Sequence, residues 1–162
     1  MHSDNLSATI RPATPADCSG ILDCLATAFA GYRDRYTPDA FLDTVLTEQT
    51  IRKRMREMTV FVAEDGSQQV CGTIACSVLN HGEGHLRGMA VKPDWQGSSV
   101  ATQLLERAEQ ELRASGCSFV TLDTTEPLDR AMRFYEKSGY RRTGRITRFF
   151  GMRLIEYRKL LF

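Results

Sequence analysis

The sequence predicts an α/β (α+β) protein with a mixed, mostly antiparallel central sheet of about seven strands and helices on both faces. Apolar runs bounded by Gly, Pro, Asn and Asp recur along the chain, as in strands. Other segments carry apolar residues at helical spacing. Their order, β-α-α-β-β-β-α-β-α-β-β, joins an antiparallel run to a β-α-β crossover. Where such a sheet changes connection type, a ligand site is expected.

In the first third of the chain, a strand over 8–11 is closed by Pro12. Thr14 as N-cap and Pro15 at the first helical position predict a helix that ends at Gly31. Thr37-Pro38 repeats this start signal, and an apolar helical stripe follows with an expected break near Thr47. The stripe consists of Phe41, Leu42, Val45, Leu46, Ile51, Met55 and Met58. The basic run 52–56 is interpreted as a solvated helix face.

The rest of the chain alternates strands and helices. The expected strands are 60–64, 70–79, 85–91, 119–124, 140–145 and 152–161. The first two are joined by the turn Asp65-Gly66-Ser67, and the next follows Asn80-His81-Gly82. The expected helices are 99–115, with Gly116 past its end, and 128–138, stopped by Gly139.

Composition favours a single globular domain over 1–162. Hydrophobic residues make up 42% and charged residues 25%, which excludes disordered and fibrous classes. With 21 basic and 20 acidic residues, neither nucleic acid nor a membrane surface is an expected partner. Five cysteines without CxxC spacing predict reduced thiols and no metal site. The chain has neither a secretory signal pattern nor an apolar run of about 20 residues, so we expect a cytoplasmic protein.

The segment 93–101 has the features of an anion-binding loop. It is a short polar loop between a strand and a helix, and it is rich in small residues. Backbone N–H groups at a helix start carry partial positive charge and suit a phosphate or pyrophosphate. No Lys-Ser or Lys-Thr follows, so the segment is not a Walker loop.

Three motifs resemble those of the GCN5-related N-acetyltransferase (GNAT) superfamily. Residues 95–101, WQGSSVA, resemble its Q/R-x-x-G-x-G/A loop, although Ser99 replaces the central glycine. Residues 85–93, HLRGMAVKP, are similar to its fourth strand, and 131–140, AMRFYEKSGY, to its A-x-x-x-Y-x-K-x-G-F/Y helix. The element order also agrees over essentially the whole chain. The resemblance implies the acyl-CoA N-acyltransferase fold.

The resemblance implies acetyl-CoA as cofactor. The expected cofactor-binding residues are Met89, Ala90, Val91, Gln96, Gly97, Ser98, Ser99, Val100, Ala101 and Tyr135. The loop would hold the pyrophosphate, and the strand backbone would pair with the pantetheine arm. The thioester would lie in a gap between the strands 85–91 and 119–124. Ser99 can either crowd the phosphate or donate a hydrogen bond to it.

Acetyl transfer to an amine needs an acid for the leaving thiolate and a base for the ammonium. The resemblance implies that Tyr135 is the acid. If the resemblance is set aside, the apolar stripe of its helix predicts that Tyr135 is an aromatic residue of the core. His85 is the candidate base because some relatives keep a glutamate there, and its ordinary pKa of about 6.5 suits proton acceptance. Glu83 and a water relay are the alternatives. His85, Arg87 and Met89 are expected on one strand face.

The acceptor is expected to be a primary amine of a small molecule or peptide. Tyr32, Tyr36, Arg33 and Arg35 can either recognise it or form a solvated loop. Arg87 and Asp123, on the two strands beside the expected gap, are further candidate acceptor-binding residues. The terminal run 152–162 is apolar enough to pack against a second copy as a homodimer.

The sequence leaves three hypotheses about function. The first is an N-acetyltransferase. The second is a non-catalytic acyl-CoA sensor, which is favoured by Ser99, by Leu128 where many relatives carry asparagine, and by the lack of a carboxylate at 85. The third is an O-acyltransferase or an enzyme with another acyl donor.

Overall fold

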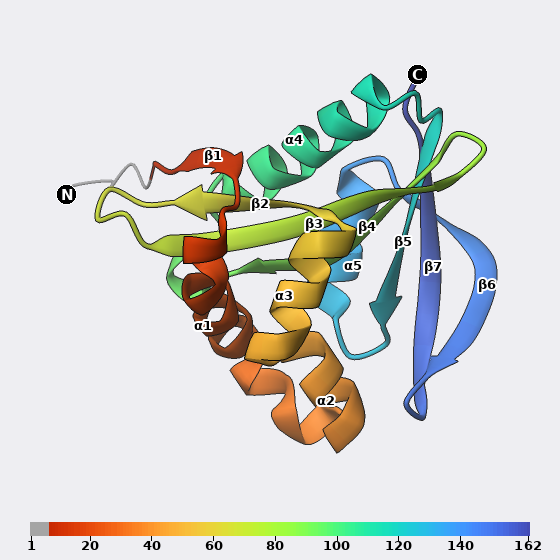
Figure 1. Cartoon of the computed structure of the whole chain (residues 1–162). Helices are drawn as coiled ribbons and strands as arrows, with labels where there is room; N and C mark the ends of the chain where they lie inside the picture. The colour runs from red at the N-terminus through yellow and green to blue at the C-terminus, as the bar shows by residue number, and fades with distance from the viewer. Residues whose placement is uncertain (1–6) are drawn as a thin grey trace.

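The computed structural model describes residues 7–162 and contains one seven-stranded sheet in the order β1-β2-β3-β4-β5-β7-β6 (Figure 1). Its strands are β1 (Thr9–Pro12), β2 (Thr59–Glu64), β3 (Val70–Asn80), β4 (Glu83–Val91), β5 (Phe119–Thr125), β6 (Arg141–Phe149) and β7 (Met152–Leu160). Its α-helices are α1 (Cys18–Phe29), α2 (Pro38–Val45), α3 (Glu48–Glu57), α4 (Val100–Ala114) and α5 (Asp129–Lys137). The predicted fold class is confirmed.

Among the strands of residues 7–162, only β4 and β5 pair in parallel, and every other neighbouring pair is antiparallel. Their pairing starts at Glu83 opposite Phe119 and ends at Leu86 opposite Leu122. Beyond these residues the two strands diverge. In Figure 1, β2 to β4 run across the view, whereas β5 and β7 run down it. The divergence opens the sheet at the carboxyl ends of β4 and β5.

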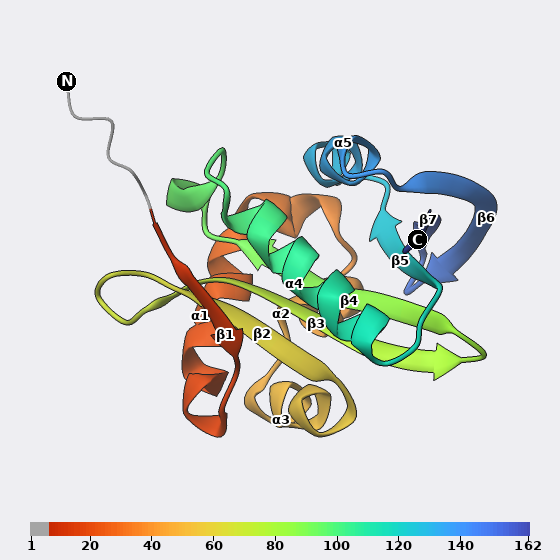
Figure 2. The same ribbon diagram turned by 90° about the horizontal axis from the view of Figure 1, so that it is seen from above.

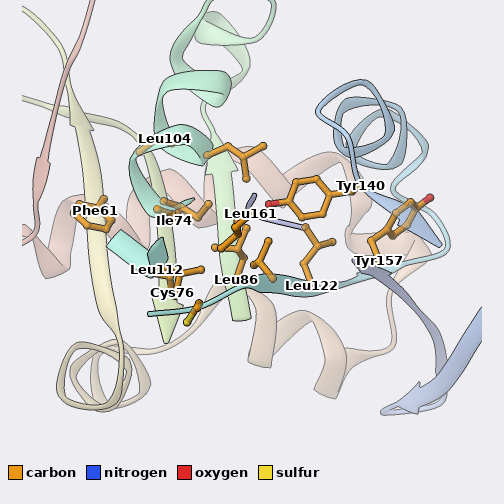
Figure 3. Close-up of a cluster of buried hydrophobic side chains, with 14 of the residues drawn as sticks. Phe61, Ile74, Cys76, Leu86, Leu104, Leu112, Leu122, Tyr140, Tyr157 and Leu161 are labelled. Carbon is orange, nitrogen blue, oxygen red and sulfur yellow. The ribbon is translucent and has the colours of Figure 1, made fainter. Parts of the chain in front are cut away.

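Helices cover both faces of the sheet (Figure 2). On one face, Val100, Leu104, Leu105 and Leu112 of α4 pack against β2, β3 and β4, and Met132 of α5 joins the same cluster. Figure 3 shows Leu104 and Leu112 of α4 beside Ile74 and Leu86 of the sheet. On the other face, α1 and α3 bury Ile21, Leu25 and Ile51 against Val60 and Val62.

The predicted break in the second helical stripe is confirmed, because α2 and α3 are separate helices. Leu46 adopts a positive φ of 66°, and the Thr47 hydroxyl then accepts the Thr50 N–H at the start of α3. The first helix differs from expectation. Thr14 and Pro15 begin a 3₁₀ turn over Pro15–Asp17, and α1 starts only at Cys18. Gly31 is not in the left-handed region, and the chain continues through it as a 3₁₀ helix over Ala30–Arg35.

Strand β4 contains a bulge that the sequence pattern did not reveal. Ala75 faces Arg87 and Thr73 faces Ala90, so β4 holds one more residue than β3 over this step. Gly88 lies in the bulge with φ of 64°. The extra residue reverses the alternation, so Met89 packs with the α4 face and Ala90 with the α1 face. The prediction that Met89 shares a face with His85 and Arg87 was therefore wrong.

The apolar terminal run is used inside the chain. Strand β7 is paired on both sides, and Met152, Ile155, Tyr157 and Leu161 are buried. The apolar residues of 152–162, which suggested a homodimer, are thus largely accounted for by packing within the chain.

All five cysteines are buried and unpaired. Within residues 7–162, no helix is long and apolar enough to cross a membrane. Residues 1–6, at the start of the stretch assessed for a signal sequence, lie outside the described part.

Asp17 ties β1 to the start of α1, which predicts a pH-dependent contribution to stability. Its carboxylate accepts two hydrogen bonds from the Arg11 guanidinium, both 2.8 Å, and one from the Thr14 N–H at 2.7 Å. Arg11 is the main cause that holds the pKa of Asp17 below its ordinary value. We expect Asp17→Asn to lower the free energy of unfolding at pH 7 by about 2 kcal/mol.

The stabilisation by Asp17 requires the ionised carboxylate. It is present above the unfolded-state pKa of about 3.8 and is lost as the pH falls through the lower folded-state value. Urea unfolding of the wild type and Asp17→Asn should therefore show a difference that shrinks towards pH 3. A difference that stays constant from pH 7 to pH 3 would contradict this assignment.

Candidate active site

A cavity of about 830 Å³ opens where β4 and β5 diverge, and it extends from the start of α4 to α1 and α2. The lining includes twelve of the predicted catalytic, cofactor-binding and acceptor-binding residues: Tyr32, Tyr36, Arg87, Met89, Ala90, Val91, Gln96, Gly97, Ser98, Ala101, Asp123 and Tyr135. His85, Ser99 and Val100 are not part of the lining. The divergence of two strands thus brings together residues from five separate segments of the chain.

The loop before α4 presents backbone donors to one end of the cavity. Among residues 7–162, the N–H groups of Gly97, Ala101 and Thr102 have no hydrogen-bond acceptor, and all three residues line the cavity. Those of Ala101 and Thr102 belong to the first helical turn, where no intrahelical acceptor exists. These donors and the helix dipole favour an anion here.

The hydroxyls of both loop serines have partners within the chain, and of the two residues only Ser98 lines the cavity. The Ser98 hydroxyl donates to the Trp95 carbonyl. Ser99 Oγ accepts a 2.7 Å hydrogen bond from Gln103 Nε2 on the exposed side of α4. The side chain that replaces the family's glycine at 99 therefore does not fill the space in front of the backbone donors.

Tyr135 lines the cavity from α5 on the α4 side of the sheet. Its ring is fixed among aromatic neighbours, with centroids 5.5 Å from Phe134 and 5.8 Å from Tyr140. Burial raises the pKa of Tyr135 well above the ordinary value of about 10, so the hydroxyl stays protonated at neutral pH. No side chain or backbone group of residues 7–162 binds that hydroxyl, which leaves its hydrogen available to a ligand.

His85 and Asp123 form a pair on the opposite face of β4 and β5. Asp123 lines the cavity, and its Oδ2 lies 3.9 Å from His85 Nε2. Thr121 donates to Glu83 Oε2 at 2.9 Å, so its oxygen accepts from His85 Nδ1–H at 2.9 Å. Because these hydrogen bonds place the proton of neutral His85 on Nδ1, its lone pair lies on Nε2, towards Asp123.

Burial changes both pKa values in this pair. It lowers the pKa of His85 and raises the pKa of Asp123, and each is partly offset by the charge of the other. Burial thus draws the two proton affinities closer together. The pair can hold one proton at the wall of the cavity.

The far wall of the cavity is aromatic. Tyr36 is buried, its ring meets Phe41 edge-on with centroids 6.3 Å apart, and its hydroxyl is bonded to Thr125 Oγ1. Tyr32 is half-buried beside Phe29. Of the four residues considered for acceptor recognition, the two tyrosines line the cavity, whereas Arg33 and Arg35 do not. Arg33 instead covers the Phe41 ring at 4.4 Å from its centroid.

Sequence reasoning missed several polar residues of the lining, among them Thr124 and Arg54. Thr124 Oγ1 on β5 is the buried side-chain atom that finds no hydrogen-bond partner among residues 7–162. Arg54 on α3 is only 8% exposed and also lines the cavity, so the interpretation of 52–56 as a solvated face was wrong at this residue. The helical spacing from Ile51 to Arg54 to Met58 was the available signal. No group of three or more metal-ligating side chains is found within 7–162.

Comparisons with known proteins agree with the motifs. Residues 23–140 match the model of the acetyltransferase (GNAT) family. A GNAT-family acetyltransferase from Staphylococcus aureus Mu50 superimposes with a TM-score of 0.79 at 15% identity, over 96% of this chain and 100% of that one. The ribosomal-protein-S18-alanine N-acetyltransferase of Escherichia coli gives 0.76 at 18% identity, over 96% and 94%.

A third solved structure was determined with a ligand. The PaiA N-acetyltransferase from Thermoplasma acidophilum, in complex with coenzyme A, gives a TM-score of 0.78 at 14% identity, over 93% of this chain and 98% of that one. At these identities the structural likeness establishes the fold, and the family model, which spans most of the chain, establishes the relationship. With the predicted fold and motifs in place, this chain belongs to the GNAT family of acetyltransferases.

Proposed function

We propose that this protein transfers an acetyl group from acetyl-CoA to a primary amine of a small molecule or peptide. The observation that carries the proposal is the continuity of one cavity. It joins unpaired backbone donors at the start of α4, the gap between β4 and β5, and a wall that carries Asp123. A cofactor arm and an amine can therefore meet from opposite faces of the sheet.

The residues present fit an acyl-CoA. The N–H groups of Gly97, Ala101 and Thr102 would hold the pyrophosphate, together with the backbone of 96–101. The backbone of Met89 and Val91 would bond the pantetheine arm along the edge of β4 that β5 leaves free beyond Leu86, while β3 pairs with the other edge. Thr124 Oγ1, buried without a partner, offers a further hydrogen bond. When bound, acetyl-CoA supplies a thioester carbonyl that an amine can attack, with a thiolate as leaving group.

The chain's own side chains would manage the two protons. Asp123 would receive the acceptor's ammonium group and, with His85, take up its proton. Tyr135 would donate its hydrogen to the leaving sulfur from the other face. In this arrangement His85 is a positioning residue behind Asp123, since it does not line the cavity.

The proposal is tested by release of free thiol from acetyl-CoA with a panel of primary amines. Amine-dependent release of thiol and formation of the N-acetyl product are expected. Tight binding of acetyl-CoA without turnover on any amine would favour the sensor instead. Two reasons for considering a sensor are weakened here: Asp123 supplies a carboxylate beside His85, and Ser99 is turned away from the cavity.

Two glycines offer a matched test of the cofactor end. Gly97 and Gly116 have φ values of 83° and 86°, and an added Cβ meets no atom within 4 Å at either position. Alanine should therefore destabilise both to a similar extent, by about 1 kcal/mol. Only Gly97 lines the cavity. We expect Gly97→Ala to weaken acetyl-CoA binding about tenfold in calorimetry and Gly116→Ala to leave it unchanged. Equal affinities for the two variants would place the cofactor elsewhere.

A further inference from the structure

Arg54 is a buried cation that has no counter-ion of its own. It projects from the last turn of α3, is 8% exposed, and lines the cavity on the face opposite α4. Among residues 7–162, its guanidinium makes no hydrogen bond or ion pair within normal distance. The Arg54 nitrogens are not among the fully buried polar atoms without a partner, so they remain accessible from the cavity. A guanidinium in such a largely enclosed place is stabilised by a ligand that supplies acceptor oxygens.

The neighbouring charges do not neutralise Arg54. Arg87 lies nearby and forms its own ion pair, with Nη2 3.1 Å from Asp43 Oδ2. Burial, and to a smaller degree the positive charge of Arg87, lower the pKa of Arg54 to about 10, while Asp43 opposes this shift. Arg54 therefore remains cationic at neutral pH. This end of the cavity holds two arginines and one aspartate that is already paired.

The bulge in β4 makes room for Arg54. A Cβ atom built on Gly88 would overlap the Arg54 guanidinium, and its φ of 64° also favours glycine. The guanidinium thus lies directly against the backbone of β4, at the residues where the strand turns away from β5. The position of the Arg54 guanidinium therefore depends on the bulge at Gly88, beside the gap between β4 and β5.

Asp123 gives the same cavity an opposite charge on the neighbouring strand. A small molecule between Arg54 and Asp123 would meet a cation at one end and an anion at the other. Neutral or purely cationic amines would leave Arg54 buried and unpaired. An acceptor with a carboxylate as well as an amine satisfies both groups.

We propose that the acceptor is a small amino carboxylate whose carboxylate group binds Arg54 while its amine is held at Asp123. The inference rests on the proposed acetyl transfer and names its substrate class. The guanidinium offers two parallel N–H donors to a carboxylate, a geometry that lysine cannot reproduce.

The test uses matched acceptors. Linear ω-amino carboxylates from glycine to 6-aminohexanoate are each compared with the corresponding amide, at saturating acetyl-CoA. At one or more chain lengths we expect kcat/KM for the carboxylate to exceed that for the amide at least tenfold. Arg54→Met should abolish this preference by lowering the carboxylate value alone. Arg56→Met is the control, since Arg56 lies in the same last turn of α3 and is exposed.

A binding measurement separates this inference from the proposed function. Each pair is titrated by calorimetry into the protein with coenzyme A present. Binding of a carboxylate that Arg54→Met abolishes supports the inference even without turnover. Turnover of amines with equal kcat/KM for carboxylate and amide would overturn it and leave acetyl transfer intact. It would also be overturned if Arg54→Met raised KM for acetyl-CoA or if no carboxylate bound or reacted.

Discussion

Tyr135→Phe is expected to lower kcat about 100-fold, the lower end of what a positioned general acid contributes. The hydroxyl of Tyr135 has no partner among residues 7–162, and burial raises its pKa, so it is protonated when a thiolate would form beside it. Phenylalanine keeps the ring contacts with Phe134 and Tyr140 and removes only the donor. Affinity for acetyl-CoA should therefore change little, and the loss should appear in kcat.

Tyr157→Phe is the matched control for the loss of a tyrosine hydroxyl. Its ring lies 6.4 Å from that of Tyr135 in the same cluster, but it does not line the cavity. Its hydroxyl is already engaged by Glu136 and Arg142. We expect about 1 kcal/mol of lost stability and unchanged kcat. If Tyr135→Phe and Tyr157→Phe reduced kcat equally, Tyr135 would be a structural aromatic and not the acid.

The fold was predictable because its signals are local. Turn residues such as Asp65-Gly66-Ser67, caps such as Thr37, and apolar periodicity fix most elements within a few residues. The predicted element boundaries are wrong mainly where contacts between distant residues determine the local backbone conformation. Asp17 turns its carboxylate back to Arg11 and Thr14, which leaves a 3₁₀ turn where an α-helix was expected. Strand β6 extends to Phe149 because it pairs with β7 through a bulge near Gly144.

The site was predictable to the extent that it is carried by contiguous motifs. The loop around Gly97 and the helix with Tyr135 both reach the cavity. Residues whose role depends on the bulge at Gly88 were misplaced. Strict alternation put Met89 on the face of His85, and a basic run concealed Arg54. A single extra residue in a strand changes which side chains face the substrate, and no periodicity argument detects it.

Asp123→Asn is expected to lower kcat/KM about 100-fold, because the variant can neither neutralise the ammonium nor share its proton with His85. The pH profile adds a test that a purely structural role would not pass. The charge of Asp123 raises the pKa of His85 against the effect of burial. Without that charge, burial lowers the pKa of His85 further, so the remaining acidic limb of kcat/KM should move to lower pH.

In the wild type, burial lowers the pKa of His85 below its ordinary value of about 6.5 and raises the pKa of Asp123 above its ordinary value of about 3.8. Activity should therefore decline as the pH drops below the ordinary histidine value and the pair becomes protonated. Asp34→Asn, an exposed site outside the cavity lining, should keep the wild-type profile. A full-rate Asp123→Asn enzyme with an unshifted acidic limb would assign the proton acceptor to a water relay, since neither carboxylate nor imidazole would then govern the reaction.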